Sequence, residues 1–510
     1  MLSKSKFYLK VFFGGILSGI SISFSYLIPI YFIGYYVLIK GLLNNQDYTT
    51  SCISGWCFGA GFFLSSMHWI VNPFLVYDEH FFLVPFIFIL FPTVMAIFYS
   101  VSCILIRFFL NKFNNHQHLL FMNGFVISIM LFFSEYLRSF IFGGLPFNLA
   151  GHIWVFDNRL IKIVSFIGVF GLSILTTYWI TLLSLLLIKK KFKYFIISIF
   201  SLPTFLFFFP ISGATNLSNQ TQTVSVRIIQ PNIPQKEKWK KSYFEKHIEN
   251  LIGLSKKKNP EDELLVIWPE VALTVYLNEQ NNLLEYLKRN LDKNTTLITG
   301  GLRRNFTGKN FEIYNSLYVI QNNTVNFYDK RRLVPFGEFI PLRSLFNFLK
   351  LTPGQTDFSE GNKSNFLTIS FNNKIIGFEP SICYEAIFQS FNHNKIMLII
   401  NITNDAWFGN TTGPIQHLTA SIFRSVEKGV PLVRSANSGI STITDANGKT
   451  LERIELNERG IIQRDILLRK NSTFFVEYGN KTVLMMLIFI FIVSFLIDLI
   501  IKKRKSLKNI

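Results

Sequence analysis

The sequence predicts an integral membrane protein built from a polytopic helical domain of about eight spans and a separate α/β domain. Of its 510 residues, 49% are hydrophobic and 56 are Phe, which is too apolar for a wholly soluble chain. Long uncharged apolar runs fill the first 210 residues and return once near the C-terminus. Between them, short β-type runs alternate with helical patterns, which is typical of a layered α/β domain.

The apolar runs have the length of membrane helices, since about 20 residues cross the hydrocarbon core. Seven runs precede residue 211 and an eighth closes the chain. We place them at 9–25, 27–43, 53–73, 81–109, 119–142, 160–188, 192–210 and 481–501. The sequence therefore divides into a membrane domain (1–210), an α/β domain (211–480), and a last span with a basic tail (481–510).

The Lys and Arg residues of the short loops predict the orientation, because such residues favour the cytoplasmic side. Basic residues precede the first span, follow the sixth as Lys189, Lys190 and Lys191, and end the chain in KKRKSLK. Both termini are therefore expected in the cytoplasm. An odd number of spans then places residues 211–480 on the extracytoplasmic side.

The net charge of +20 arises partly from this excess of Lys and Arg in the loops expected on the cytoplasmic side. A nucleic-acid partner is not expected, because no basic helix or base-stacking motif accompanies the charge. The expected partner is the lipid bilayer, and the protein is expected to be a monomer.

The α/β domain shows its elements in order along the chain. Three amphipathic patterns predict helices at 242–257, 281–292 and 414–429. The dipeptide Asn447-Gly448 between alternating runs predicts a β-hairpin. The β-type runs that precede this hairpin lie at 224–230, 264–268, 296–302, 315–321, 325–330, 366–371, 374–383 and 396–403.

Polar residues follow several of these strands, where sites of α/β domains collect. Glu270 follows the strand at 264–268, Lys330 ends the strand at 325–330, and Glu338 lies beyond a Pro-Phe-Gly turn. Cys383 ends the strand at 374–383 and has no second cysteine in its domain. An unpaired thiol outside the cytoplasm is either buried and inert or kept for its reactivity.

A thiol becomes a nucleophile when a base takes its proton and a cation favours the thiolate. A carboxylate and an ammonium at neighbouring strand ends supply both. The histidines of the domain are His247, His393 and His417, and none follows a strand in the same way. A Cys-His dyad is therefore disfavoured, with His417 as its remaining candidate. Metal catalysis is also disfavoured, because no His/Cys cluster has ligand spacing, and no cofactor is expected.

Four motifs together resemble the carbon-nitrogen hydrolase (nitrilase) superfamily with its Glu-Lys-Cys triad. They are WPE, K-x-x-L-V-P-F-G-E, C-Y-E and N-D-A-W-F-G. The segments SEYLRSFIFGGLPFN (134–148) and QPNIPQKEKW (230–239) extend the resemblance to the membrane branch of that superfamily, the apolipoprotein N-acyltransferases. The resemblance covers nearly the whole chain and implies an αββα sandwich for the α/β domain.

The resemblance assigns roles to residues of this chain. It implies Glu270 as general base, Lys330 as the cation of the triad and Cys383 as the nucleophile. Supporting or substrate-binding roles fall to a further set: Trp239, Glu338, Tyr384 and Glu385. The chain departs from the family pattern at Tyr136, Phe147 and Arg332, none of which is a residue of the triad.

The implied activity is transfer of an acyl chain from a membrane phospholipid to the α-amino group of a lipoprotein's N-terminal diacylglyceryl-cysteine. The expected route is a ping-pong reaction through a thioester on Cys383, at the periplasmic side of a bacterial inner membrane. The alternative is a membrane-tethered amidase that hydrolyses a C–N bond. A transporter is disfavoured because the spans hold few charged residues, and the intact triad residues argue against an inactive scaffold.

Overall fold

A computed structural model describes most of the chain as two compact units. The described residues are 2–112, 119–209, 221–256, 262–308, 310–322, 324–341, 356–362, 366–391, 396–469 and 472–508. The first unit comprises 1–71, 83–213 and 477–510, and the second comprises 72–82 and 214–476. The predicted boundary at 210/211 falls among residues outside the described ones.

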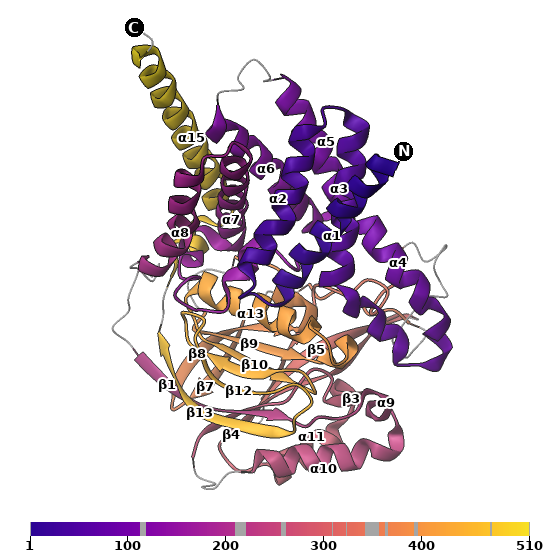
Figure 1. The fold of residues 1–510 in the computed structure, drawn as a ribbon. Helices are drawn as coiled ribbons and strands as arrows, with labels where there is room; N and C mark the ends of the chain where they lie inside the picture. The colour runs from indigo at the N-terminus through magenta and orange to yellow at the C-terminus, as the bar shows by residue number, and fades with distance from the viewer. Residues whose placement is uncertain are drawn as a thin grey trace. The chain divides into compact units, whose positions relative to one another are not determined.

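The secondary structure described in the first unit consists of helices, joined by loops (Figure 1). Its long helices are α1 (Leu2–Ser23), α2 (Ile28–Asn44), α3 (Tyr48–Ser66), α4 (Val84–Met95), α5 (Ile97–Lys112), α6 (Leu120–Arg138), α7 (Val164–Ile188), α8 (Phe192–Phe208) and α15 (Lys481–Lys508). Several glycines bring these helices into close contact. An added Cβ on Gly15 would lie 2.0 Å from the backbone oxygen of Phe58 in α3, so α1 and α3 meet backbone to backbone.

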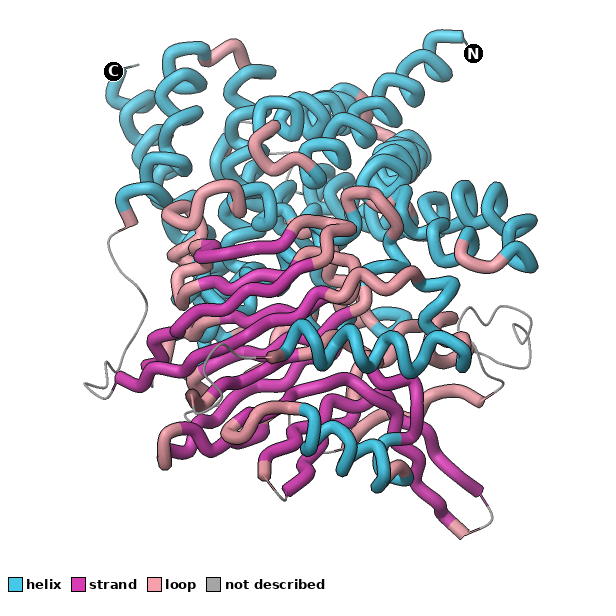
Figure 2. Tube along the Cα trace, turned by 90° about the horizontal axis from the view of Figure 1, so that it is seen from below, coloured by secondary structure: helices cyan, strands magenta, loops and turns pink. Residues whose placement is uncertain are grey.

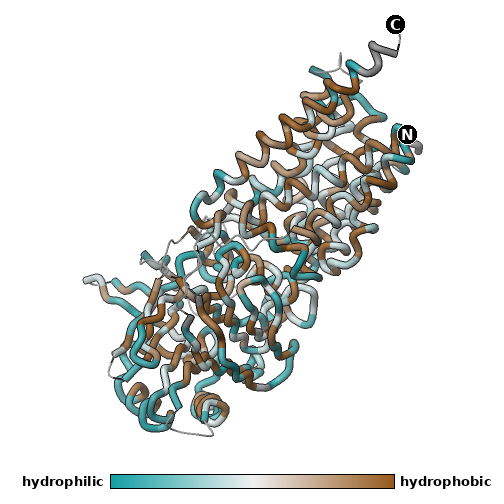
Figure 3. The backbone as a smooth tube through the Cα atoms, turned by 90° about the vertical axis from the view of Figure 1, so that its left-hand side faces the viewer, coloured by the Kyte–Doolittle hydropathy of each residue, from teal (hydrophilic) through white to brown (hydrophobic). Residues whose placement is uncertain are grey.

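The expectation of several apolar helices is confirmed. Within the described residues, four stretches are long and apolar enough to cross a membrane, at 78–112, 120–138, 164–188 and 481–503. Hydrophobic residues dominate α15 in Figure 3. Helices α2 and α8 are apolar but span only 17 residues each. The count of eight spans and their orientation therefore stay predictions.

The predicted fourth run, 81–109, is not one unbroken helix. A 3₁₀ turn at Asp78–Leu83 leads into α4, and α5 begins two residues after α4 ends. Pro92 lies inside α4 and cannot donate a backbone hydrogen bond, which weakens the helix close to this break.

The second unit contains two β-sheets. The seven-stranded sheet has the order β13-β1-β2-β4-β5-β6, with β3 also paired to β4, and the six-stranded sheet has the order β12-β11-β10-β9-β8-β7. The strands of the first sheet are β1 (Thr221–Gln230), β2 (Leu264–Ile267), β3 (Leu273–Tyr276), β4 (Thr295–Thr307), β5 (Asn310–Gln321), β6 (Thr324–Asp329) and β13 (Gly460–Arg469). Those of the second are β7 (Leu367–Phe371), β8 (Lys374–Ile382), β9 (Leu398–Thr403), β10 (Leu432–Ala436), β11 (Ser441–Thr444) and β12 (Thr450–Ile454).

The two sheets pack face to face (Figure 2). Their shared core takes Val226, Ile228 and Leu317 from the first sheet and Phe378 and Ile400 from the second, all fully buried. Burial of these alternating side chains is the main force that holds the sandwich together.

Helices cover the outer faces of the sandwich. Helices α10 (Phe244–Ser255) and α11 (Asn281–Asn290) pack their apolar residues on the seven-stranded sheet. Helix α13 (Gly413–Lys428) lies on the six-stranded sheet, where the guanidinium of Arg434 in β10 donates to the Ser421 hydroxyl at 3.1 Å. The predicted α/β domain is therefore present, with helices on both sides of two sheets.

Candidate active site

The sandwich brings the ends of three strands together around one buried cluster. Glu270 follows β2, Lys330 follows β6, and Cys383 follows β8 directly. Their exposed fractions are 6%, 1% and 9%, so all three are shielded from water. The sequence therefore located three residues that the fold gathers from both sheets.

Lys330 lies between two carboxylates. Its Nζ is 3.4 Å from Oε1 of Glu270 and 2.8 Å from Oε1 of Glu338. Asn315, in the middle of β5, donates through Nδ2 to the same two oxygens at 2.8 and 3.0 Å. The second oxygen of Glu338 accepts the backbone N–H of Val334 at 2.9 Å. These contacts fix the ammonium and both carboxylates in one arrangement.

Two further contacts fix the loop that carries Glu270. The Oε2 atom of Glu270 accepts the backbone N–H of Asn404 at 2.8 Å, which links this loop to the end of β9. Gly300 in β4 passes close beneath: a Cβ there would lie 2.3 Å from the backbone nitrogen of Val271, closer than real Cβ atoms come. Only glycine permits this approach, so Gly300 lets the carboxylate sit at its strand edge.

Cys383 adopts an unusual backbone conformation. Its φ is +48°, in the left-handed region that non-glycine residues rarely occupy. Nε2–H of His417 donates to the Cys383 carbonyl oxygen at 2.9 Å, and Nδ1 of the same ring lies 2.9 Å from Oδ1 of Asp405. Asp405 is paired in turn with Arg434 at 2.7 Å. Both nitrogens of His417 are thus engaged by the network that holds the turn carrying the thiol.

Burial dominates the electrostatics of the cluster. It raises the pKa of the Cys383 thiol to about 12, with the Glu270 charge adding to the rise and Lys330 opposing it. Burial alone would lower the pKa of Lys330, but Glu338 and Glu270 outweigh it and raise that pKa above its ordinary range. Burial therefore favours the neutral form of the thiol, whereas the two carboxylates favour the charged form of the Lys330 amine.

Glu385 connects the turn of Cys383 with the loop of Lys330. Its Oε2 accepts the backbone N–H of Ile382 at 2.8 Å, and its Oε1 accepts that of Arg331 at 2.7 Å and the Tyr328 hydroxyl at 2.8 Å. Tyr384 packs its ring edge-on against Phe388, with centroids 5.1 Å apart. Glu385 therefore ties these two segments together, and Tyr384 lies in the turn that follows the thiol.

Trp239 lies at the end of the short helix α9 (Gln235–Lys238). Its indole nitrogen is buried and makes no hydrogen bond within the described residues. The contact to the cluster comes instead from Lys238, whose Nζ donates to the backbone oxygen of Glu270 at 2.9 Å. Lys238 was not predicted from the sequence. It does lie in the segment QPNIPQKEKW, directly before Trp239, and this was the signal that could have pointed to it.

Among the described residues, no group of three His, Cys, Asp or Glu side chains is placed where it could hold a metal ion. His393, one of the three histidines considered from the sequence, lies outside the described residues.

Comparison with known proteins agrees with this geometry. Residues 225–470 match the carbon-nitrogen hydrolase family, and residues 14–183 match the apolipoprotein N-acyltransferase N-terminal domain. Fold and site thus define a membrane-bound member of the carbon-nitrogen hydrolases.

Similar proteins of known name show which family within this class the chain belongs to. The apolipoprotein N-acyltransferase of Rickettsia prowazekii is 36% identical over 95% of this chain and 97% of the relative, and that of Rickettsia typhi is 37% identical over the same shares. The enzyme of that name from Allorhizobium ampelinum is 31% identical over 87% of this chain and 85% of the relative. The chain belongs to the apolipoprotein N-acyltransferase family and is an acyltransferase.

Proposed function

We propose that this protein transfers an acyl chain from a membrane phospholipid to the α-amino group of a lipoprotein's N-terminal diacylglyceryl-cysteine. The observation that carries the proposal is the buried cluster of Cys383, Glu270 and Lys330 in a chain that also has apolar membrane helices. The cluster supplies a nucleophile, a base and a cation, which is the set that acyl transfer through a thioester needs.

In the first half-reaction Glu270 accepts the thiol proton, and Cys383 attacks the ester carbonyl of the phospholipid. The negative charge that develops on the carbonyl oxygen is stabilised by Lys330 and by a backbone N–H near Tyr384. Removing one such donor typically costs on the order of 10²–10³ in rate. Glu270 returns its proton to the departing alkoxide, so that a lysophospholipid leaves and a thioester remains on Cys383.

In the second half-reaction the free α-amino group of the acceptor attacks the thioester. Glu270 takes the proton that the amine loses, and the thiol is regenerated as the amide forms. Glu338 holds Lys330 through both steps by its 2.8 Å contact. The N–H donors on Glu270, from Asn315 and Asn404, fix its carboxylate for proton transfer in either direction.

A membrane-mounted site suits two substrates that are both anchored in lipid. Drawing an acyl chain into water costs about 0.8 kcal/mol for each CH₂, so a soluble enzyme would face a large penalty. We place the catalytic domain at the periplasmic face of the bacterial inner membrane, with both termini in the cytoplasm. We expect the active form of the protein to be a monomer. Hydrolysis of a small C–N substrate would not need the membrane helices.

The test is direct detection of the thioester. Purified protein is incubated with phospholipid in the absence of acceptor and analysed by intact mass. We expect an acyl adduct on Cys383 that hydroxylamine removes and that Cys383→Ala abolishes. An adduct that persists in the Ala variant, or no adduct at all, would overturn the mechanism.

A matched variant separates loss of chemistry from loss of fold. Cys103 is a buried thiol of the helical unit. Cys103→Ala should leave the adduct unchanged. Adding a synthetic diacylglyceryl-cysteine peptide should then discharge the adduct and yield N-acylated peptide. Release of free fatty acid in place of the amide would favour the hydrolase alternative.

A further inference from the structure

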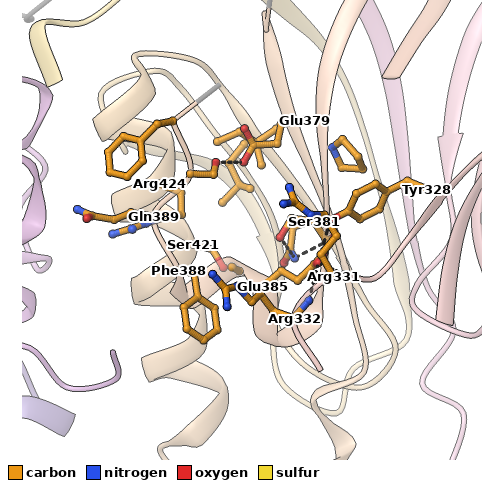
Figure 4. Close-up of a pocket in the computed structure, with 17 residues that line it drawn as sticks. Tyr328, Arg331, Arg332, Glu379, Ser381, Glu385, Phe388, Gln389, Ser421 and Arg424 are labelled. Carbon is orange, nitrogen blue, oxygen red and sulfur yellow. Dashed lines mark hydrogen bonds between the residues drawn. The ribbon is translucent and has the colours of Figure 1, made fainter. Parts of the chain in front are cut away.

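A cavity lies on the six-stranded side of the sandwich, beside the turn that carries Cys383. Its volume is about 250 Å³, and it is walled by β8, the η9 turn (Cys383–Ile387) and α13 (Figure 4). Three guanidinium groups line it, from Arg331, Arg332 and Arg424. None of the three is a residue of the proposed proton transfers, although Glu385, which also lines the cavity, holds the turn of Cys383.

Arg424 is the unusual member of this set. Its exposed fraction is 5%, and its Nε finds no hydrogen-bond partner among the described residues. Nη1 has only an ion pair with Glu427, at 3.1 Å and one helical turn away. A buried guanidinium with open donors is costly, because burial removes the water that would otherwise satisfy them. The open donors therefore mark a place for an acceptor.

The two carboxylates that line the cavity do not fill that need. Glu379 is paired with Lys428 at 2.6 Å and accepts the Ser390 hydroxyl at 2.6 Å. The carboxylate oxygens of Glu385 accept hydrogen bonds from the Tyr328 hydroxyl and from backbone N–H groups. Both acids are thus committed to other donors of the protein. Arg424 keeps its ion pair with Glu427 but has an Nε donor without a hydrogen bond among the described residues.

Arg331 and Arg332 form the open side of the cavity. Both are exposed, and within the described residues neither guanidinium has a carboxylate partner. Arg332 lies over the ring of Phe388, 5.4 Å from its centroid, and Phe391 beside it is 38% exposed. Figure 4 shows Arg331 and Arg332 next to Glu385, which holds their backbone. The mouth is therefore cationic and aromatic at once.

We propose that this cavity binds a phosphate group, carried by a phospholipid headgroup or free in solution. Guanidinium groups recognise phosphate oxygens with paired hydrogen bonds, and groups from two separate elements can reach different oxygens of one phosphate. The Ser381 hydroxyl in the wall adds a further polar contact. The assignment concerns binding alone and stands whether or not the proposed acyl transfer is correct.

The experiment uses the full-length protein in a nonionic, phosphate-free detergent. Its thermal stability is followed while inorganic phosphate is titrated at constant ionic strength against chloride, since a ligand that binds the folded state raises the midpoint. We expect a saturable rise specific to phosphate. In Arg424→Lys, and separately in the surface pair Arg331→Gln/Arg332→Gln, half-saturation should need about tenfold more phosphate, the loss of one charge-assisted bond.

Arg289→Gln is the matched control, because Arg289 is an exposed arginine on α11. It should respond as the unmodified protein does. No phosphate-specific rise, or an equal response in all variants, would overturn the proposal. The surface pair keeps the test decisive even if Arg424→Lys fails to fold.

A second arm identifies the source of the phosphate. The titration is repeated in nanodiscs of phosphatidylglycerol and in a nonionic lipid. If phosphatidylglycerol abolishes the response to inorganic phosphate, the headgroup occupies the cavity. If the response persists unchanged in both, the site binds the free anion.

Discussion

The His417 ring donates from Nε2 to the backbone oxygen of Cys383 at 2.9 Å, from a position that is fully buried. The histidine considered as a possible base thus contacts the main chain of Cys383, the proposed nucleophile. Because Cys383 has φ of +48°, its turn depends on such contacts to keep an unfavourable conformation.

His417→Ala should therefore slow acyl-adduct formation by about 10²-fold, the scale expected when a reacting group moves by about 1 Å. His417→Gln keeps an N–H donor and should recover part of the rate. The measurement is adduct formation per folded molecule, well below each variant's own midpoint of unfolding. His247→Gln, in α10, serves as control. Equal rates for the Ala and Gln variants would argue against a role in positioning.

Glu270→Gln should affect two reactions of Cys383 in opposite directions. The Glu270 charge adds to the burial that raises the thiol pKa to about 12, so removing it lowers that pKa and increases the thiolate fraction at neutral pH. Alkylation by a small reagent such as iodoacetamide should accelerate. Acyl transfer from phospholipid should slow, because Glu270 is the group that we propose takes and returns the proton.

Both rates are measured on the same preparation by intact mass. Glu249→Gln, at an exposed position of α10, should change neither. If both reactions slow together in Glu270→Gln, the base also controls alkylation and the electrostatic account of the raised pKa is wrong.

Because the pKa of Lys238 is lowered in the folded protein, we expect its contribution to the free energy of unfolding to depend on pH. Burial lowers the pKa of its amine to about 8, against the opposing charges of Glu270 and Cys383. In the unfolded chain the value is about 10.4, so between these values the unfolded state binds more protons than the folded one. The contribution of Lys238 to stability therefore rises with pH from about 8 to about 10.4.

Lys238→Met should flatten that rise, as seen in unfolding midpoints measured between pH 7 and 10.5. Lys240→Met removes the same charge from an exposed position two residues on and should leave the pH profile unchanged. A rise that survives in Lys238→Met would assign it to another group.

Gly300→Ala should displace the Glu270 loop, since the new Cβ would meet the backbone of Val271 at 2.3 Å. Overpacking of this kind costs about 1–3 kcal/mol, and adduct formation should fall with it. Gly253→Ala makes the same change in α10 where nothing lies within 4 Å, and should stabilise by up to about 1 kcal/mol. Unfolding midpoints and adduct rates of the pair test this; equal effects would exclude the close approach as the cause.

Much of the α/β domain could be predicted from local patterns. The predicted hairpin at Asn447-Gly448 is confirmed: β11 and β12 pair antiparallel around it, and Gly448 has φ of +77°. The three predicted helices are present as α10, α11 and α13. Alternation and turn residues suffice for such elements because their signals are short-range.

Other elements of the fold form through contacts between residues that are far apart in the sequence. Strand β13 carries Gln463, Arg464 and Asp465 in its middle, and it was missed because its pairing with β1 joins residues over 200 positions apart. The same holds within the site. Asn315 is unremarkable inside its strand, and only the fold shows that its amide joins the carboxylates of Glu270 and Glu338.

The pairing of β1 with β13 also governs when the catalytic domain can be completed during synthesis. Thr221, the first residue of β1, lies opposite Arg469, the last of β13, and the ladder continues to Gln230 opposite Gly460. One edge of β1 therefore stays open until residues 460–469 have left the ribosome, shortly before α15 is made. An open strand edge is prone to pair with other chains. This edge stays unpaired while the residues between β1 and β13 are synthesised, and the pairing of β13 then closes the sheet.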